Sequence, residues 1–339
     1  MPVRPAAACP PLAQPLDNTA PDSTPVVDVA VGVLIRSDGR VLMAERPAGK
    51  PSAGFWEFPG GKFEPGESPV AALARELHEE LGVDLDAAWP WVTRVHAYSY
   101  TTVRLHIYRV PRWHGKPHGR EGQQLAWVDP CAPAVSPLLA ANHSIMQALA
   151  LPPVYAITHA SHYGVPAFLE RLQAALESGV RLVQVRERGM PEEELTGFAR
   201  DVTQRAHAAG ARVLINADEQ LCHRAGADGV HLPSAQLMRS HSRPDTGLCA
   251  ASCHSREELL QAAALGVDFA VLSPVLPTRS HPGQPGLGWE RFAKLCRDLP
   301  MPVYALGGMQ PGMLDSAMQH NAHGVALLSG AWQAEPAAG

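Results

Sequence analysis

The sequence predicts a two-domain α/β protein in which a mixed α/β domain is followed by a (β/α)8 barrel. The 339 residues exceed the size at which one hydrophobic core usually stops growing. The first half mixes strand-like runs with one strongly amphipathic stretch. The second half alternates eight short apolar runs with helix-like stretches, which is typical of a parallel sheet buried on both faces. An open, doubly wound sheet is the alternative for the second half.

The composition argues against a nucleic-acid polymer or a membrane as partner. The net charge is −5 and no stretch is dense in Lys and Arg. No long apolar run of membrane-spanning length occurs, and residues 1–25 are rich in Pro and Ala without the apolar centre of an export signal. The six cysteines include no CxxC pair. We therefore expect a disordered tail at 1–25, reduced thiols and a cytoplasmic protein, and the sequence leaves the oligomeric state open.

The first domain is expected over residues 26–150. Its expected elements, in order, are a buried strand at VVDVAVGVLI, a hairpin turn at SDGR, a partner strand at VLMAER, a Gly- and Pro-rich loop, a helix from about Ser68 to Leu81, strands at VRLHIYRV and QQLAWVD, and a short helix at NHSIMQALA. Leu151-Pro152-Pro153 then predicts a stiff linker.

The second domain is expected over residues 154–333. Its eight predicted strands are VYAITH, VRLVQVRER, RVLINA, GVHLPS, LCAASCH, FAVLSPV, PVYALGG and GVALLSG. A (β/α)8 barrel carries its functional groups at the C-terminal ends of the strands, often with a phosphate site after the last two. Backbone amides at two glycine turns can cradle a phosphate there, namely Gly307, Gly308, Ser329 and Gly330. Glycines that only shape tight strand-to-helix turns are the alternative.

Three carboxylates in the first domain indicate a metal site. Glu76, Glu79 and Glu80 lie at i, i+3 and i+4 of the predicted helix, so they emerge on one face. Hard cations such as Mg²⁺ take carboxylate oxygens as ligands, and a bound metal removes the repulsion between the three charges. For these residues alone, a solvated acidic helix face is the alternative.

The segment GKFEPGESPVAALARELHEELGV, residues 61–83, resembles the Nudix box. The matching positions are Gly61, Glu67, Arg75, Glu76, Leu77, Glu79, Glu80, Gly82 and Val83. The resemblance implies an α/β/α sandwich that hydrolyses a nucleoside di- or triphosphate with Mg²⁺ or Mn²⁺. It also implies that Glu76, Glu79 and Glu80 bind the metal together with the Gly60 carbonyl and help activate the attacking water, and that Arg75 and Glu67 brace the box.

Flanking motifs are similar to the MutT-type members of the Nudix family, which hydrolyse 8-oxo-dGTP. VAVGVLI, AER, WEFPGGK, REGQQLAW and PLLAANHSI follow in the family's order. The similarity implies that Arg46 and Asn142 read the oxidised guanine, and that Glu121 is a further metal-binding or catalytic carboxylate. It also implies a lining of the base and phosphates by Glu57, Phe58, Pro59 and Gly60.

Each of these assignments has an alternative from the residues alone. Asn142 precedes a predicted helix and is equally suited to cap it. Arg46 is otherwise a surface residue, and Glu121 a solvated residue of a charged loop. Pro51 stands where MutT-type enzymes carry a histidine near the nucleotide.

Residues 154–332 resemble thiamine-phosphate synthase and its TenI-like relatives. The motifs that carry the resemblance are QVRER, INAD, GADGVHLPS, ASCHSREEL, SPVLPTRSHPGQPGLGW, YALGGMQP and HGVALLSG. The resemblance implies a TIM barrel in which Gln184, Arg186 and Asn216 contact a pyrimidine pyrophosphate. Thr278, with the glycine turns, is implied to bind a thiazole phosphate.

Several positions depart from the synthase pattern. Arg188 and His281 stand where lysines are usual, and Ala217 stands where an aspartate is usual. The segment PSAQ after GVHL lacks the expected acidic Mg²⁺ ligand, and Pro274 replaces the acid/base histidine of TenI-like tautomerases. Because carboxylates hold Mg²⁺ against a leaving pyrophosphate, neither catalytic pattern is intact. His281 is either an acid/base or phosphate-binding group or a surface-loop residue.

The expected function is the conversion of 8-oxo-dGTP to 8-oxo-dGMP and pyrophosphate, which sanitises the nucleotide pool for DNA replication and repair. One alternative is a bifunctional thiamine-pathway enzyme whose first domain cleaves pyrimidine or thiamine pyrophosphates. Another is an inert barrel that only binds a thiazole- or phosphate-containing metabolite. Fold alone decides none of these.

Overall fold

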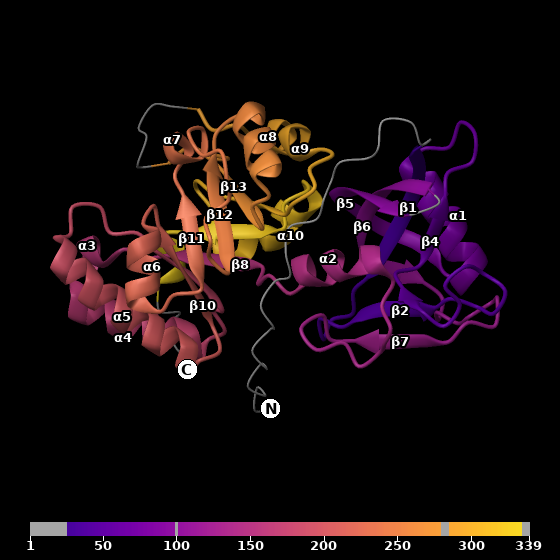
Figure 1. Cartoon of the computed structure of the whole chain (residues 1–339), viewed down its shortest axis with the longest axis horizontal. Helices are drawn as coiled ribbons and strands as arrows, with labels where there is room; N and C mark the ends of the chain where they lie inside the picture. The colour runs from indigo at the N-terminus through magenta and orange to yellow at the C-terminus, as the bar shows by residue number, and fades with distance from the viewer. Residues whose placement is uncertain (1–25, 99–100, 279–284, 334–339) are drawn as a thin grey trace. The chain divides into compact units, whose positions relative to one another are not determined.

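The computed structural model describes residues 26–98, 101–278 and 285–333 (Figure 1). The chain divides between Ala150 and Leu151 into two compact units, each of which is described by itself below. Among the described residues, every helix is too short or too polar to cross a membrane.

The first unit contains two sheets. A four-stranded mixed sheet has the order β4 (Gly60–Lys62), β1 (Val26–Leu34), β6 (Thr101–His114) and β5 (Asp84–Tyr98). A three-stranded antiparallel sheet has the order β3 (Trp56–Glu57), β2 (Val41–Glu45) and β7 (Leu125–Val128). The two helices of this unit are α1 (Pro69–Leu81) and α2 (Ala140–Leu149).

Strand β1 separates two apolar layers. Val31 and Val33 pack into a cluster with Ile145 of α2, because side chains on a strand alternate between its faces. Ala30 and Leu34 point to the other layer, where α1 contributes its buried leucines. The predicted α/β/α sandwich is therefore confirmed, with α1 and α2 on opposite sides of β1.

The predicted hairpin turn is present, since Arg36 N donates to the Arg40 carbonyl at 3.0 Å, but the predicted pairing of the first two strands does not extend beyond it. Only an isolated bridge between Ile35 and Val41 joins them, and β1 and β2 then enter different sheets. The physical reason is that both edges of β1 are already used, since β6 pairs with it in parallel and β4 antiparallel. Strand β5 was not among the predicted strands; it pairs antiparallel with β6, with register shifts between Leu85 and Val92.

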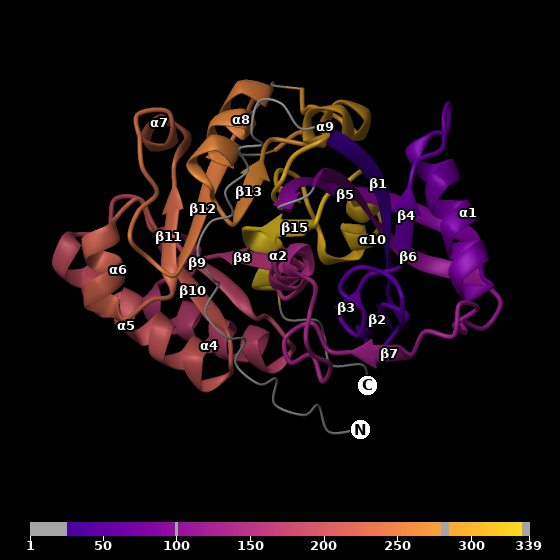
Figure 2. The ribbon, with the colours of Figure 1, turned by 45° about the vertical axis from the view of Figure 1, so that its right-hand side comes forward.

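The second unit is a closed barrel of eight parallel strands, so the open-sheet alternative is wrong. Its strands are β8 (Val154–Ile157), β9 (Leu182–Val185), β10 (Arg212–Asn216), β11 (Gly229–Leu232), β12 (Leu248–Cys253), β13 (Phe269–Leu272), β14 (Val303–Ala305) and β15 (Gly324–Leu327). All eight predicted strands are present. Their residues are nearly all buried because helices cover the outside of the barrel, as α4, α5, α6 and α8 do in Figures 1 and 2.

The barrel helices follow the strands in regular alternation. They are α3 (Ala160–Tyr163), α4 (Val165–Glu177), α5 (Glu192–Ala208), α6 (Glu219–Ala225), α7 (Ser234–Leu237), α8 (Arg256–Leu265), α9 (Trp289–Cys296) and α10 (Leu314–Gln319), with short 3-10 helices η1 (Pro311–Met313) and η2 (Ser329–Ala331). Tyr155, Phe269 and Tyr304 belong to the apolar cluster that fills the barrel. The interior is thus a packed core, and any ligand site must lie at the strand ends.

The cysteines differ between the two units. The four described cysteines of the barrel are free and buried, namely Cys222, Cys249, Cys253 and Cys296. Cys131, in the first unit, is disulfide-bonded. Its partner lies outside the described residues, so the expectation of reduced thiols stays a prediction at this position.

Candidate functional site

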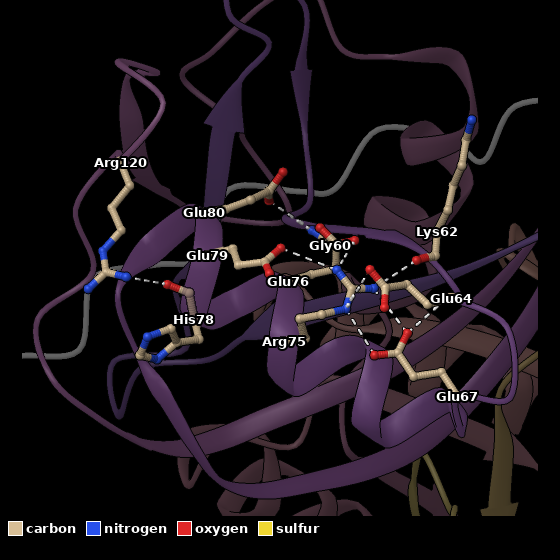
Figure 3. A network of polar contacts seen from close by, with 10 residues as sticks. All are labelled: Gly60, Lys62, Glu64, Glu67, Arg75, Glu76, His78, Glu79, Glu80 and Arg120. Atoms are coloured by element: carbon tan, nitrogen blue, oxygen red, sulfur yellow. Dashed lines mark hydrogen bonds and ion pairs between the residues drawn. The ribbon is translucent and has the colours of Figure 1, made fainter.

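Helix α1 presents its carboxylates because its other face is buried. Ser68 caps the helix by accepting a hydrogen bond from Ala71 N, and Gly82 ends it in a left-handed conformation. Four apolar residues face the core, namely Ala72, Leu73, Leu77 and Leu81. The opposite face carries Glu76, Glu79 and Glu80 toward the start of strand β4 at Gly60 (Figure 3).

Arg75 organises the middle of this face (Figure 3). Its Nε and Nη2 donate to the two carboxylate oxygens of Glu67 at 2.9 and 3.0 Å, and Nη2 also donates to the Lys62 carbonyl at 3.0 Å. Its Nη1 donates to Glu76 at 2.8 Å and to Glu79 at 3.2 Å. The hydrogen bond from Arg75, aided by Glu64 N–H, holds the pKa of the Glu67 carboxyl below its usual range. Arg75 therefore fixes the positions of two predicted metal ligands.

Glu80 is the predicted ligand that has no cationic partner among the described residues. Its carboxylate is half-buried and accepts a hydrogen bond from Gly60 N at 3.2 Å. Burial, together with repulsion from Glu76, Glu121 and Glu57, raises the pKa of Glu80 to about 7 although the Gly60 N–H opposes this. Carboxylates from helix α1, from strand β3 and from the loop before β7 thus surround one half-buried carboxylate.

Two glycines of strand β4 let its backbone approach helix α1 closely. A Cβ on Gly61 would lie 2.2 Å from the Glu76 carboxyl carbon, and a Cβ on Gly60 would lie 2.0 Å from the Ala30 carbonyl oxygen. Gly60 also has a φ of +142°, which side-chain-bearing residues rarely adopt. The glycine pair therefore lets the backbone lie directly against the carboxylate face of α1.

The described side chains do not form a ready-made metal cage, since no group of three His, Cys, Asp or Glu is placed to hold a metal ion as they stand. Arg75 is paired with Glu76 and Glu79, and Lys50 is paired with Glu121. The donor set still fits a hard divalent cation, because it consists of carboxylates gathered around an unpaired one.

The predicted nucleotide-binding residues hold one another. Arg46 Nη1 lies 2.7 Å from both carboxylate oxygens of Glu57. Asn142 Oδ1 accepts a hydrogen bond from Phe58 N at 3.2 Å. Asn142 does not cap helix α2, since Leu139 is the N-cap and Asn142 is buried in the first turn. Both residues support the segment 57–60, in which Pro59 O accepts from Gly32 N.

The loop around Glu121 is tied to helix α1 by contacts of Gln123 and Arg120. Gln123 Nε2 donates to the Glu80 carbonyl at 3.0 Å, and Gln123 Oε1 accepts from Glu121 N at 2.8 Å. Arg120 Nη1 donates to the His78 carbonyl at 2.9 Å (Figure 3). These contacts satisfy carbonyls at the C-terminal end of α1 and bring Glu121 beside Glu80.

The barrel brings some of its predicted residues together at the C-terminal strand ends, here called the mouth. Gln184 Nε2 donates to Asn216 Oδ1 at 3.2 Å. Arg186 is half-buried and Arg188 exposed, and neither forms an ion pair with a described residue. Burial, reinforced by the Arg188 charge, lowers the pKa of Arg186. Within the described part of the barrel, the mouth therefore offers two guanidinium groups that form no ion pair with a carboxylate.

The other predicted barrel residues are less informative. Gly307 and Gly308 pack against the segment 274–277, where a Cβ on either would lie 2.8 Å from a neighbour, so turn geometry alone explains both glycines. Thr278 has a buried hydroxyl without a described partner. Ser329 is exposed and starts η2 together with Gly330. His281 lies outside the described residues.

The acidic residues near the mouth serve the backbone. Glu187 accepts hydrogen bonds from Ala160 N at 2.7 Å and Ser161 N at 3.0 Å. Asp218 caps α6 by accepting from Leu221 N at 2.8 Å. Glu258 accepts from His254 N at 2.5 Å and from a serine hydroxyl. Each of these carboxylates already has a structural role, which the sequence alone did not reveal.

Comparison with known proteins follows the division of the chain. A family model described as thiamine monophosphate synthase matches residues 154–331. A family model described as NUDIX domain matches residues 30–148. Each half of the chain is therefore similar to a different enzyme family.

Three curated relatives illustrate this. A putative thiamine-phosphate synthase of Geobacter sulfurreducens is 36% identical over 52% of this chain and 84% of its own length. A CTP pyrophosphohydrolase of Escherichia coli is 39% identical over 35% of this chain and 87% of its own length. An 8-oxo-dGTP diphosphatase of Haemophilus influenzae is 36% identical over 31% of this chain and 76% of its own length.

Proposed function

Because the chain belongs to the thiamine monophosphate synthase family through residues 154–331 and carries a NUDIX domain over residues 30–148, we propose that it joins a nucleotide pyrophosphohydrolase to a barrel that binds a phosphate ester. The proposed reaction of the first domain is the Mg²⁺- or Mn²⁺-dependent hydrolysis of 8-oxo-dGTP to 8-oxo-dGMP and pyrophosphate. This reaction would sanitise the nucleotide pool. We take the two domains as residues 26–150 and 154–333.

The observation that carries the proposal is the unpaired, half-buried carboxylate of Glu80. It lies against Gly60 N, and three further carboxylates are close enough to repel it. Such a concentration of negative charge is costly unless a cation binds there. When bound, the metal supplies neutralisation of phosphate oxygens and activation of the attacking water.

The remaining residues of the site hold this arrangement. Arg75 orients Glu76 and Glu79 through one nitrogen while Glu67 holds its other two. Asn142 and Arg46 hold both ends of the short segment that contains Glu57 and Phe58. Preorganised positions of this kind lower the cost of ordering groups during the reaction. In this proposal Glu76, Glu79, Glu80 and Glu121 bind the metal together with the Gly60 carbonyl.

Two substrates compete within this function. 8-oxo-dGTP is proposed because Asn142 and Arg46 match the base-reading positions of MutT-type enzymes. The amide nitrogen of Asn142 donates to no described residue, so it is available to a base. CTP is the second candidate, because the relative from Escherichia coli, which is 39% identical to this chain, is named a CTP pyrophosphohydrolase.

The test is kcat/KM of the full chain with Mg²⁺ for 8-oxo-dGTP, dGTP, CTP and thiamine pyrophosphate. We expect 8-oxo-dGTP to be preferred, and Glu80→Gln to lower its hydrolysis by about 10²–10⁴-fold. Asp86→Asn is the matched control, because Asp86 forms only a surface ion pair with Arg112. Preference for CTP would move that substrate to first place, and preference for thiamine pyrophosphate would favour the thiamine-pathway alternative. Hydrolysis that Glu80→Gln leaves unchanged would overturn the proposed site.

For the barrel, the described residues do not fit a bound Mg²⁺. Glu187, Asp218 and Glu258 are engaged by backbone N–H groups, and Ala217 offers no ligand atom. The unpaired Arg186 and Arg188 suit a phosphate ester directly. We therefore expect the barrel to bind a thiazole phosphate equally with Mg²⁺ and with a chelator, as measured by calorimetry. Binding that requires Mg²⁺ would contradict this and restore synthase-like chemistry.

A further inference from the structure

Lys50 reaches the candidate metal site from outside the helix and glycine motifs. It lies in the loop between β2 and β3, and its Nζ is 2.5 Å from Glu121 Oε2. Both side chains are about half exposed. Lys50 is also close to Glu57: burial raises the pKa of that carboxyl, while Arg46 and, more weakly, Lys50 oppose the rise. One flexible ammonium group therefore lies among the carboxylates that the first domain gathers.

The backbone around Lys50 is held, whereas its side chain is not. Arg46 Nε donates to the Pro51 carbonyl at 2.7 Å, and Gly54 N donates to the Arg46 carbonyl at 3.0 Å. These bonds close the loop on both sides of Lys50. The lysine side chain itself is a point charge on four rotatable bonds, with Glu121 as its only ion-pair partner among the described residues.

The backbone of Glu121 is held beside helix α1. Gln123 bridges the Glu121 backbone nitrogen and the Glu80 carbonyl, so Glu121 is tied to the end of helix α1. The Lys50 side chain, which has more rotatable bonds than that of Glu121, can therefore change its partner while the Glu121 backbone stays in place. A divalent cation binds a carboxylate oxygen at about 2.0–2.1 Å, as Mg²⁺ does. The ammonium at Glu121 Oε2 lies on the side of the carboxylate that such a cation would approach, so the two positive charges compete for Glu121.

We propose that Lys50 is a tethered counter-cation, which neutralises Glu121 while no metal is bound and turns to the phosphates of the nucleotide when a metal ion takes Glu121. This inference rests on the proposed metal-dependent hydrolysis. It assigns Lys50 a positioning role, because Lys50 controls when Glu121 is available.

The test measures metal affinity without nucleotide, by titrating the full chain with Mn²⁺ and recording its electron paramagnetic resonance signal. Lys50→Met removes the competing charge and keeps the chain length. We expect it to bind Mn²⁺ about fivefold more tightly than the wild type, a change of ~1 kcal/mol at 1.4 kcal/mol per factor of ten. Lys50→Arg should restore the wild-type affinity. Lys116→Met is the matched control and should leave the affinity unchanged.

Nucleotide binding, measured through KM, should become weaker in the same variant. Lys50→Met should raise KM for the nucleoside triphosphate, because the ammonium no longer contacts its phosphates. A merely structural role for Lys50 would weaken metal and nucleotide binding together. Tighter metal binding with weaker nucleotide binding is therefore the signature of a counter-cation, and thermal melts should verify that each variant is folded.

The outcomes separate this inference from the proposed function. If the wild type binds Mn²⁺, Glu80→Gln weakens that binding and Lys50→Met has no effect or weakens it too, the Lys50 inference is overturned and the metal site stands. If Glu80→Gln binds Mn²⁺ as the wild type does, or the wild type binds none, both are overturned.

Discussion

The stability of the barrel should fall in mild acid because of one buried histidine. His231 lies on β11 inside the barrel, with Nδ1 3.2 Å from Tyr155 Oη and Nε2 2.7 Å from Ser252 Oγ. Burial, reinforced by the nearby charge of Arg186, lowers the pKa of His231 to about 3. The native barrel therefore keeps this imidazole neutral over most of the acid range.

The direction of this pH effect follows from the protonation of His231 in the native and in the unfolded chain. Below a pH of about 6.5 the unfolded chain protonates this histidine, whereas the native barrel does not until about pH 3. Protonation then favours the unfolded state, and each pH unit between these values costs ~1.4 kcal/mol. Between pH 7 and pH 5 the loss is ~2 kcal/mol, and above pH 7 this group contributes no pH dependence.

Urea titrations of the full chain at pH 7 and pH 5 measure this, with hydrogen exchange and mass spectrometry of peptides from β11 as the readout for the barrel. His231→Gln keeps polar atoms for Tyr155 and Ser252 but does not titrate, so its stability should fall ~2 kcal/mol less than that of the wild type. His223→Gln, at an exposed site of α6, should keep the wild-type dependence. Equal pH dependence in the wild type and His231→Gln would refute the reasoning.

Three further substitutions test the two units. Arg75→Lys keeps the charge but loses the paired bonds to Glu67, so kcat/KM of the first domain should fall by about tenfold or more, and wild-type activity would contradict this role. Gly61→Ala places a methyl group 2.2 Å from the Glu76 carboxyl carbon, so the displaced carboxylate should lower kcat by about 10²-fold in a protein that melts as the wild type does. Ala217 has a φ of +67°, a conformation that costs a side-chain-bearing residue ~1 kcal/mol. Ala217→Gly should therefore increase the free energy of unfolding of the barrel, measured in urea, by about that amount. A loss of stability would show that the Ala217 methyl group packs favourably.

Two control substitutions match the arginine and glycine changes but lie at exposed positions away from the candidate site. Arg36→Lys changes an exposed arginine whose ion pair with Asp38 spans 3.6 Å, and it should leave kcat/KM unchanged. Gly39→Ala adds a methyl group at a turn where nothing lies within 4 Å, so it should not affect kcat.

The local part of the fold could be predicted from the sequence. The helix from Ser68 to Leu81 was predictable because its period, its cap and its terminal glycine are all short-range signals. The barrel strands were predictable because a short apolar run is also a short-range signal. The turn at residues 37–40 was also predictable, whereas the separation of β1 and β2 beyond it was not, because the edges of β1 are taken by strands distant in sequence.

The candidate site also has one part that local sequence predicts and one part that depends on long-range contacts. Spacing alone placed Glu76, Glu79 and Glu80 on one face of a helix. Lys50 and Glu121 are 71 positions apart, and no local pattern announces their ion pair. Asn142 shows the same limit, since capping and support of Phe58 look alike from its neighbours and differ only in a contact 84 positions away.

The left-handed backbone at Ala217 also bears on how the barrel could change over generations. Asparagine and aspartate adopt that conformation more readily than alanine does. The fold thus retains a backbone shape that favours an acidic side chain at a strand end, although the present side chain is a methyl group. An aspartate at position 217 would therefore fit this backbone with less strain than the present alanine. In evolutionary terms, the backbone at this strand end favours the appearance of a carboxylate.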